Sequence, residues 1–114
     1  YASPQSVIQN SLISEGCNIE GHIDFSVLFA GVTIEPGAVV RDSIIMPNTM
    51  IKKGAVVEYA IVGEDCVIGE NVKVGARPES IEDKDTWGVA VIGHGVTVSD
   101  NAEIKPKAMI SADV

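Results

Sequence analysis

Aliphatic residues recur every six positions along most of this chain, and every third step is shortened to five. Residues 26–42, 43–59 and 60–76 form three consecutive blocks of this kind, all equal in length. A period of six fits neither an amphipathic helix nor an alternating strand, and it is typical of a parallel β-helix in which three short strands close each triangular coil. We therefore expect the recurring aliphatic side chains to point into the prism. They are Leu28, Ile34, Val40, Ile45, Ile51, Val57, Val62, Ile68 and Val74.

A second position, four residues after each aliphatic residue, is consistently small or β-branched, and we expect it to face inward as well. Its members are Cys17, Val32, Ala38, Ile44, Thr49, Ala55, Ile61, Cys66 and Val72. Turn-forming strings such as "EPG", "PN" and "GEN" lie between the two positions and would supply the corners. Because successive coils hydrogen-bond about 4.8 Å apart, roughly five or six coils would make a rod on the order of 25 to 30 Å long.

The ends of the repeat are irregular. Residues 11–25 form a shortened coil of fifteen, and residues 77–89 break the pattern before it resumes. The further inward residues are Ile13, Ile19, Ile23, Ile92, Val98, Ile104 and Ile110. We therefore predict a single all-β domain, with a lead-in segment at 1–10, coils at 11–76, a loop insertion at 77–89 and terminal coils at 90–114.

The charge balance argues against two classes of partner. Eight basic and sixteen acidic residues give a formal net charge of −8. Such a charge repels nucleic acid and anionic membranes on average, so we expect neither as a partner. No run of about 18 apolar residues is present. The two cysteines, Cys17 and Cys66, occupy inward positions, so we interpret them as buried thiols of a reducing, cytoplasmic compartment and not as a disulfide.

His22 and His94 are the chain's two histidines and its candidates for a catalytic base. Hexapeptide acyltransferases use such a base against a hydroxyl or amine of the substrate. Both histidines fall in turn-like strings, "EGH" and "IGHG", so we favour solvent-facing corners and predict no catalytic residue in this chain. Zinc enzymes generally use three protein ligands, which two scattered histidines do not supply, so we predict no metal site.

Two further features are candidate contact sites. Lys52 and Lys53 sit at a corner about one coil from Arg41 in the repeat. Such a cluster could hold a phosphate, although corner lysines are more often simply solvated. The loop insertion carries the chain's one tryptophan, Trp87. An aromatic residue beside charges suggests contact with another domain or subunit, and the alternative is that Trp87 caps the side of the prism.

Family-specific strings are superimposed on the repeat. Residues 10–51, "NSLISEGCNIEGHIDFSVLFAGVTIEPGAVVRDSIIMPNTMI", closely resemble the C-terminal β-helix of bacterial glucose-1-phosphate adenylyltransferases, the ADP-glucose pyrophosphorylases. The strings "GCNIEG" and "SVLFAGV" make the resemblance specific, whereas hexads are shared by many transferases. The resemblance continues through residues 58–75, "EYAIVGEDCVIGENVKVG", and more loosely to the last coils. It implies a left-handed β-helix, a hand that the period of six does not determine.

The resemblance implies a longer protein with its own chemistry. In that family an N-terminal catalytic domain makes ADP-glucose and pyrophosphate from ATP and glucose 1-phosphate, with magnesium, for glycogen synthesis. This chain would be a fragment that is inactive by itself, with residues 1–10 leading in from the missing N-terminal domain. Its implied partners are that catalytic domain, further copies in a homo-oligomer, expected to be a tetramer, and an effector such as fructose 1,6-bisphosphate or AMP.

The resemblance also implies an effector site. Basic residues near the break in the coils contact effectors in the family, and Arg77 matches that position best. Arg41, Lys52 and Lys53 complete the candidate set. The string "RPESIEDKDTWG" is more acidic than an anion pocket, which fits different regulation or a loop that serves only packing. Three alternatives stay open: a catalytically impaired partner subunit of the same enzyme, a free-standing acyltransferase that uses one of the histidines, and a scaffold for protein partners.

Overall fold

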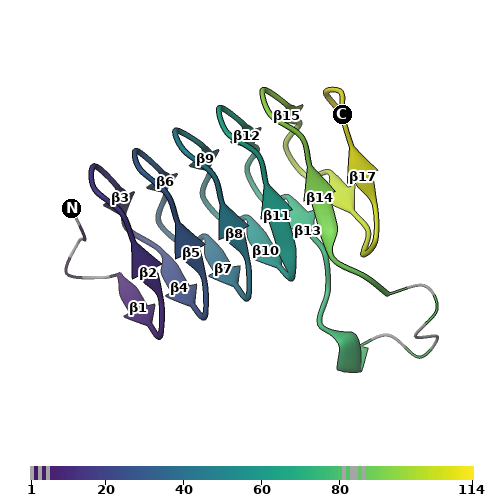
Figure 1. Ribbon diagram of the computed structural model, residues 1–114, viewed down its shortest axis with the longest axis horizontal. Coiled ribbons are helices and arrows are strands. Elements are labelled where there is room, and N and C mark those ends of the chain that lie inside the picture. The colour runs from purple at the N-terminus through teal and green to yellow at the C-terminus, as the bar shows by residue number, and fades with distance from the viewer. Residues whose placement is uncertain (1, 3, 5, 81, 83–84, 86) are drawn as a thin grey trace.

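Short parallel strands wind around a triangular prism (Figure 1). The computed structural model describes residues 1–114 apart from residues 1, 3, 5, 81, 83–84 and 86. Strands that lie one coil apart pair in parallel and build three sheets, one for each face of the prism, which we name sheets A, B and C. The expected all-β architecture of stacked coils is confirmed.

Each sheet collects one strand from successive coils. Sheet A contains β3 (Asn18–Ile19), β6 (Thr33–Ile34), β9 (Met50–Ile51), β12 (Val67–Ile68) and β15 (Thr97–Val98). Sheet B contains β1 (Val7–Gln9), β4 (His22–Asp24), β7 (Val39–Arg41), β10 (Val56–Glu58), β13 (Lys73–Val74) and β16 (Glu103–Ile104). Sheet C contains β2 (Leu12–Ile13), β5 (Val27–Leu28), β8 (Ile44–Ile45), β11 (Ala60–Val62), β14 (Ala90–Ile92) and β17 (Met109–Ile110).

The pairing register reproduces the spacing of the sequence repeat. Val40 pairs with Val57, which occupies the same place in the next block of the sequence. Ile19 pairs with Ile34 across a shorter stretch of chain, which confirms the shortened coil. In Figure 1 the chain runs up the near face along sheet C, turns over the top through sheet A and descends behind along sheet B as it advances. The β-helix is therefore left-handed, as the resemblance implies.

The recurring aliphatic side chains form the core, as expected. All nine of them, from Leu28 to Val74, are fully buried. Ile13 and Ile110 are only partly buried, because they lie in the first and last strands of sheet C. The interior is a stack of narrow layers, which explains why valine, isoleucine and alanine fill it without help from aromatic residues.

Two members of the second inward position point outward instead. Ile44 and Ile61 are each 37% exposed, and Ser43 and Ala60, one residue earlier, are buried in their place. The corner between sheets B and C is one residue shorter than the other corners, because a single residue at positive φ, such as Asp42 with φ 49°, makes the turn. The prediction that Ile44 and Ile61 face the core is therefore wrong. The other members are buried: Cys17, Val32, Ala38, Thr49, Ala55, Cys66 and Val72.

The break in the coils is a projecting loop (Figure 1). The chain leaves the prism after β13 at Gly75, where φ is 72° and a Cβ atom would run into the Glu58 carbonyl, so only glycine fits. The 3₁₀ helix η1 (Pro78–Ser80) follows, and β14 rejoins sheet C. Part of the predicted loop, residues 81, 83–84 and 86, lies outside the described residues.

The predicted segment boundaries stay predictions. Strand β1, within the predicted lead-in, already pairs with β4 in sheet B. No helix among the described residues is long and apolar enough to cross a membrane.

Candidate functional site

A cluster of charged side chains lies at the edge between sheets B and C. Arg41 ends β7 and Glu58 ends β10, and the two residues pair in register on adjacent strands. Glu58 Oε2 accepts hydrogen bonds from Arg41 Nη1 at 3.3 Å and from Arg77 Nε, just beyond β13, at 3.0 Å. The structure therefore brings together two of the four predicted effector residues. Glu58, the carboxylate that joins them, is not among the predicted site residues, although it occupies the same place in its block as Arg41 does in the block before.

This Arg41–Glu58–Arg77 cluster is partly shielded from water. The exposed fraction of the side chain falls from 48% at Arg77 to 31% at Arg41 and 11% at Glu58. Asp24 pairs in register with Arg41 on the preceding strand, and its Oδ1 atom is buried with no hydrogen-bond partner among the described residues. Two guanidinium groups and two carboxylates thus share this edge. A bound anion would have to compete with Glu58 for the guanidinium groups.

Trp87 packs on the same edge from the loop. Its ring meets that of Tyr59 edge-on, with centroids 5.6 Å apart and an interplanar angle of 75°. Its Nε1–H group donates a hydrogen bond to the Ala76 carbonyl at 2.7 Å. Burial, with a further contribution from the Asp42 carboxylate, raises the pKa of Tyr59 above its ordinary 10.0. Trp87 therefore caps the side of the prism, as in the second of the two interpretations, and its contact with another subunit stays a prediction.

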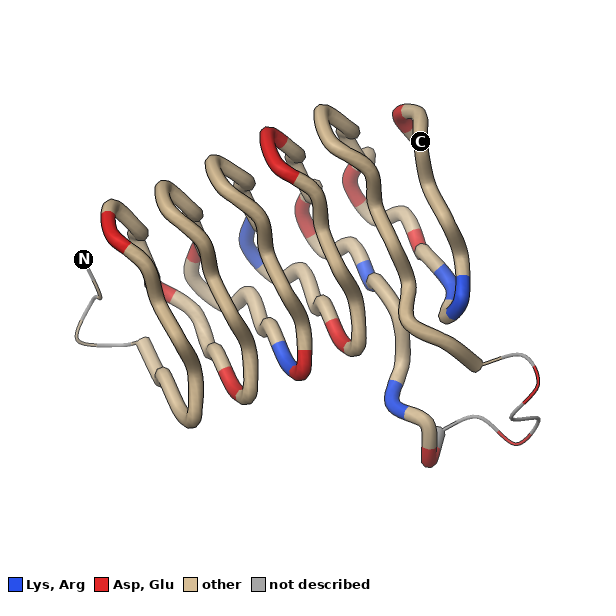
Figure 2. Tube along the Cα trace, viewed as in Figure 1, with Lys and Arg blue, Asp and Glu red and all other residues tan. Residues whose placement is uncertain are grey.

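Lys52 and Lys53 lie at a different edge of the prism. Lysines and arginines are scattered along the trace and do not gather in one cluster (Figure 2). Lys52 and Lys53 follow β9 and form the corner between sheets A and B, whereas Arg41 lies at the corner between sheets B and C. The backbone N–H of Lys53 donates to Glu35 Oε1 at 3.0 Å, so a carboxylate lies beside this corner. The structure does not bring the lysines together with Arg41, because residues about one coil apart along the chain need not share an edge.

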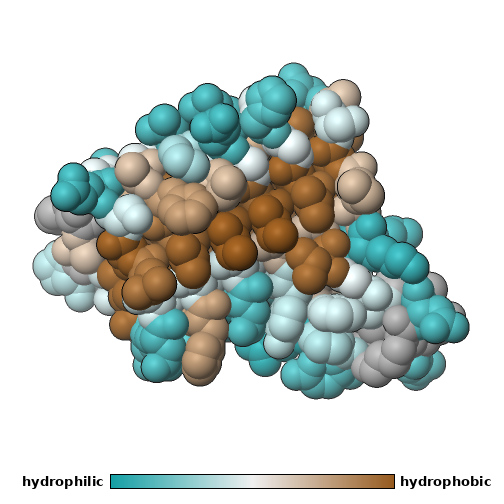
Figure 3. All heavy atoms as spheres, in the orientation of Figure 1, coloured by the Kyte–Doolittle hydropathy of each residue, from teal (hydrophilic) through white to brown (hydrophobic). Residues whose placement is uncertain are grey.

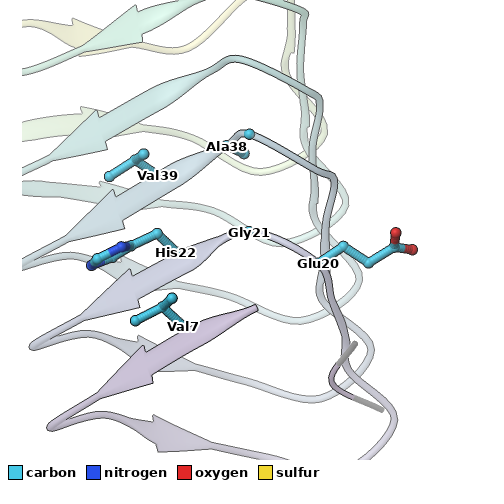
Figure 4. A pocket seen from close by; sticks show the side chains of 7 residues that line it. Val7, Glu20, Gly21, His22, Ala38 and Val39 are labelled. Carbon is cyan, nitrogen blue, oxygen red and sulfur yellow. The ribbon is translucent and has the colours of Figure 1, made fainter. Parts of the chain in front are cut away.

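The two histidines lie on separate parts of the surface. We expected His22 at a corner, but it is the first residue of β4. Its side chain lies between Val7 and Val39 on the outside of sheet B (Figure 4). A hollow of about 160 Å³ adjoins it, lined also by Glu20, Gly21, Gly37 and Ala38. His94 is exposed in the turn between β14 and β15, as expected. A general base also needs space for a substrate, and this hollow is small beside the roughly 300–1,000 Å³ of typical ligand sites.

Both cysteines are buried free thiols, as expected, and the reducing compartment inferred from them stays a prediction. The thiol of Cys66 donates a hydrogen bond to the Gly93 carbonyl at 2.9 Å. Burial raises the pKa of the Cys66 thiol above its ordinary 9.0 and makes it a poor nucleophile at neutral pH. Across the described residues, no group of three or more His, Cys, Asp or Glu side chains is placed to hold a metal ion.

The outer face of sheet C is apolar from its first strand to its last (Figure 3). Leu12 at one end is 72% exposed and Met109 at the other is 81% exposed. The outward residues of the six strands pair in register as one row: Leu12, Val27, Ile44, Ile61, Val91 and Met109. This row is not among the predicted features, because two of its members, Ile44 and Ile61, are predicted to lie in the core. The signal that identifies it is an apolar residue directly before each inward aliphatic residue of this face.

Comparison with known proteins gives a family match and partial relatives. A model of the family described as GlmU-like, C-terminal hexapeptide, matches residues 2–99. Glucose-1-phosphate adenylyltransferases of Bacillus thuringiensis (strain Al Hakam) and Bacillus anthracis are each 51% identical to this chain over 47 residues. That stretch is 41% of this chain and only 12% of the length of those relatives. The resemblance that the sequence carries is therefore confirmed over part of the chain.

Solved structures share the fold at low sequence identity. The acetyltransferase domain of PglB from Neisseria gonorrhoeae superposes with a TM-score of 0.73 and 21% identity, over 99% of this chain and 49% of that one. WeeI from Acinetobacter baumannii AYE gives a TM-score of 0.54 and 17% identity, over 98% of this chain and 52% of that one. These likenesses establish the β-helix alone.

Proposed function

This chain belongs to the GlmU-like C-terminal hexapeptide family, and on that premise we propose that it is the assembly and regulatory β-helix of a glucose-1-phosphate adenylyltransferase. The observation that carries the proposal is the 51% identity over 47 residues to adenylyltransferases, against 21% to the acetyltransferase domain of the same fold. A hexapeptide repeat constrains mainly inward and corner positions. Identity at half of all aligned positions therefore requires agreement beyond the repeat itself.

The chemistry of the proposed enzyme belongs to a domain outside this chain. The full-length protein would make ADP-glucose and pyrophosphate from ATP and glucose 1-phosphate, in the cytoplasm, for glycogen synthesis. Magnesium would neutralise the reacting phosphates in that domain. Among the described residues of this chain, no cluster of His, Cys, Asp or Glu side chains is placed to hold the ion. Residues 1–114 would contribute no catalytic group. Their partners would be the N-terminal catalytic domain and further copies in a homo-oligomer, which we propose is a tetramer.

Regulation is proposed at the Arg41–Glu58–Arg77 cluster. Both guanidinium groups already reach one carboxylate oxygen, Glu58 Oε2, so their geometry suits a shared oxyanion. A phosphate that displaced Glu58 would gain charge-assisted contacts from two arginines, one on each side of the coil that carries Glu58. A sugar-phosphate or nucleotide effector would therefore bind here in competition with an internal carboxylate.

The effector proposal is tested in the full-length enzyme with fructose 1,6-bisphosphate and AMP as probes. Arg77→Ala is expected to lower the affinity for whichever probe regulates the enzyme by about tenfold, equivalent to about 1.4 kcal/mol. Arg41→Ala should lower the affinity for the same probe. Lys53→Ala, at the other edge, is the matched control and should leave the response unchanged. An equal response in the wild type and both arginine variants would place the effector elsewhere.

The acyltransferase alternative is tested separately. It requires an acyl-CoA cleft beside His22 or His94, and the hollow of about 160 Å³ at His22 is the space available to the first of them. Calorimetric titration of the 114-residue chain with acetyl-CoA should give no heat of binding. Saturable binding that His22→Ala or His94→Ala abolishes would support the acyltransferase instead.

The proposed activity is tested by measuring ADP-glucose formation by the full-length polypeptide from ATP, glucose 1-phosphate and magnesium. Activity of that polypeptide alone is the expected result. Activity that appears only after a second, homologous subunit is added would instead identify this protein as the impaired partner. Silence under both conditions would contradict the proposal.

A further inference from the structure

Two parallel rows of side chains make up the outer surface of sheet C. The first is the apolar row already described, from Leu12 to Met109. The second consists of the residue that follows each inward aliphatic residue: Ser14, Phe29, Met46, Gly63, Gly93 and Ser111. Backbone hydrogen bonds between successive coils fix the register of this second row, for example from Phe29 N–H to the Ile45 carbonyl at 2.9 Å. Neither row contains a charged residue, although the chain carries a net charge of −8.

The second row changes from large to small along the prism. Phe29 and Met46 occupy its first half, and glycines at 63 and 93 occupy its second half. A hollow of about 260 Å³, lined by Val91, Gly93, Met109, Ile110 and Ser111, lies on the second half. A cavity of about 150 Å³ already accommodates benzene, so the hollow is large enough for a phenyl ring.

The smallness of Gly93 is not required by its own coil. A Cβ atom there would lie 3.4 Å from the Ile110 carbonyl oxygen, which is ordinary contact. At Gly63, by contrast, a Cβ atom would lie 2.7 Å from backbone atoms of Gly93 and His94, so the fold itself excludes a side chain. The fold therefore explains the glycine at 63, whereas the glycine at 93 keeps open a hollow on the surface.

We propose that the outer face of sheet C is an interface between two copies of this chain, arranged antiparallel about a two-fold axis between β8 and β11. Such an axis, parallel to the strands, sets β5 opposite the partner's β14 and β2 opposite its β17. It brings the Phe29 ring of each copy onto the hollow at Gly93 of the other, and Met46 onto Gly63. Large residues thus meet small ones along the middle of the row, which is the self-complementarity that an isologous interface requires.

The apolar row matches itself under the same operation. Ile44 faces Ile61 of the other copy next to the axis, and Leu12 faces Met109 at the ends. The row spans five coil spacings of about 4.8 Å, or roughly 24 Å, and two flat sheets can pack face to face at about 10 Å. A single helix laid on the face would fill the row but leave the pairing of Phe29 with Gly93 unexplained, so we assign the face to a second copy. The proposal is independent of the proposed enzyme function, since it concerns the 114-residue chain alone.

The test is the mass of the 114-residue chain in solution, measured by light scattering and sedimentation at concentrations up to about 1 mM, where even millimolar association is detectable. We expect a species of twice 12.0 kDa. Its formation should strengthen as salt rises, because the like charges that surround the apolar face are screened.

Two variants test the pairing itself. Gly93→Leu fills the hollow that receives Phe29 and should raise the concentration for half-dimerisation at least tenfold, with melting unchanged. The exchange variant, Phe29→Gly with Gly93→Phe, restores a large residue opposite a small one and should recover the dimer. Thr33→Leu, on the outside of sheet A, is the matched control and should leave the mass unchanged.

Three results would overturn the proposal. The first is a monomer at every concentration and salt, and the second is a dimer that Gly93→Leu leaves intact. The third is a full-length protein that protects positions 44 and 61 from solvent while it stays monomeric, which would mean that another part of the polypeptide covers the face. Loss of ADP-glucose synthesis has no bearing on these outcomes, so the two proposals fail separately.

Discussion

The hydroxyl of Ser26 accepts the backbone N–H of Ser43, one coil further on, at 3.2 Å, and donates to the Asp24 carbonyl at 2.9 Å. Ser43 repeats the arrangement: its hydroxyl accepts the N–H of Ala60 at 3.2 Å and donates to the Arg41 carbonyl at 2.7 Å. This ladder satisfies buried backbone groups at the short corner between sheets B and C. Serine is therefore the inward residue at this corner because its hydroxyl replaces a backbone partner, and not merely because it is small.

Ser43→Ala should destabilise the fold. The change leaves the buried N–H of Ala60 without its acceptor, so we expect the free energy of unfolding to fall by about 1–3 kcal/mol. Urea denaturation monitored by far-UV circular dichroism measures the difference. Ser14→Ala, at an exposed position, is the control and should change stability by less than about 0.5 kcal/mol. Equal stability of the two variants would mean that the ladder contributes nothing.

Ile51→Asp places a carboxylate in the middle of an aliphatic ladder. Ile51 is fully buried between Ile34 and Ile68 on adjacent strands of sheet A, so the charge would be buried without a partner. We expect a loss of several kcal/mol, visible as unfolding at room temperature or a greatly lowered melting temperature. Lys53→Glu, at an exposed corner, should change melting little. A normal melting temperature for Ile51→Asp would contradict the register.

The stability of the chain should depend on the protonation of Cys66. Burial raises the pKa of this thiol above its ordinary 9.0. The folded state therefore keeps a proton that the unfolded state loses, and this stabilisation is complete below pH 9.0 and declines as the pH rises towards the folded-state pKa. Urea titrations of wild type and Cys66→Ala between about pH 7 and about pH 10 should show the wild type losing more stability. Parallel pH profiles for the two proteins would refute the assignment.

Glu58→Gln should loosen the loop. The substitution keeps the shape of the side chain but removes the charge that holds Arg41 and Arg77, with an expected cost of about 1–2 kcal/mol. Because Trp87 packs on Tyr59 beside this cluster, its fluorescence should shift to longer wavelength as the loop becomes more hydrated. Glu64→Gln, at an exposed turn, is the matched control. An unchanged emission spectrum in Glu58→Gln would show that Trp87 is held independently of the cluster.

Much of the fold could be predicted from the sequence because each coil repeats the same local requirements. The spacing between Val40 and Val57 in the sequence predicts that these two residues stack on adjacent coils, as they do. The shortening of the first coil can also be read from the sequence. The prediction failed at Ile44 and Ile61 because the corner before them turns on one residue at positive φ, which a fixed count of four does not allow for. The same fixed count places Ile44 and Ile61 in the core, so the outward apolar row of sheet C is not predicted either.

The candidate site was harder to predict because it is assembled at an edge. Arg41 and Arg77 meet through Glu58, whose place directly after the inward Val57 matches that of Arg41 after Val40, but the hexad pattern alone does not mark this place as part of a site. Lys52 and Lys53 looked equally suitable by spacing, yet they lie at another edge. Spacing along a solenoid predicts which layer a residue occupies, and the local length of each corner decides which edge it reaches.

The central claim is tested most directly by comparing four samples in one assay of ADP-glucose formation from ATP, glucose 1-phosphate and magnesium. The samples are the full-length polypeptide, the same polypeptide without residues 1–114, the 114-residue chain alone, and the last two mixed. The account predicts activity in the full-length protein, none in the 114-residue chain, and loss of assembly or of effector response when residues 1–114 are removed. ADP-glucose formation by the 114-residue chain itself, or none by the full-length protein, would contradict it.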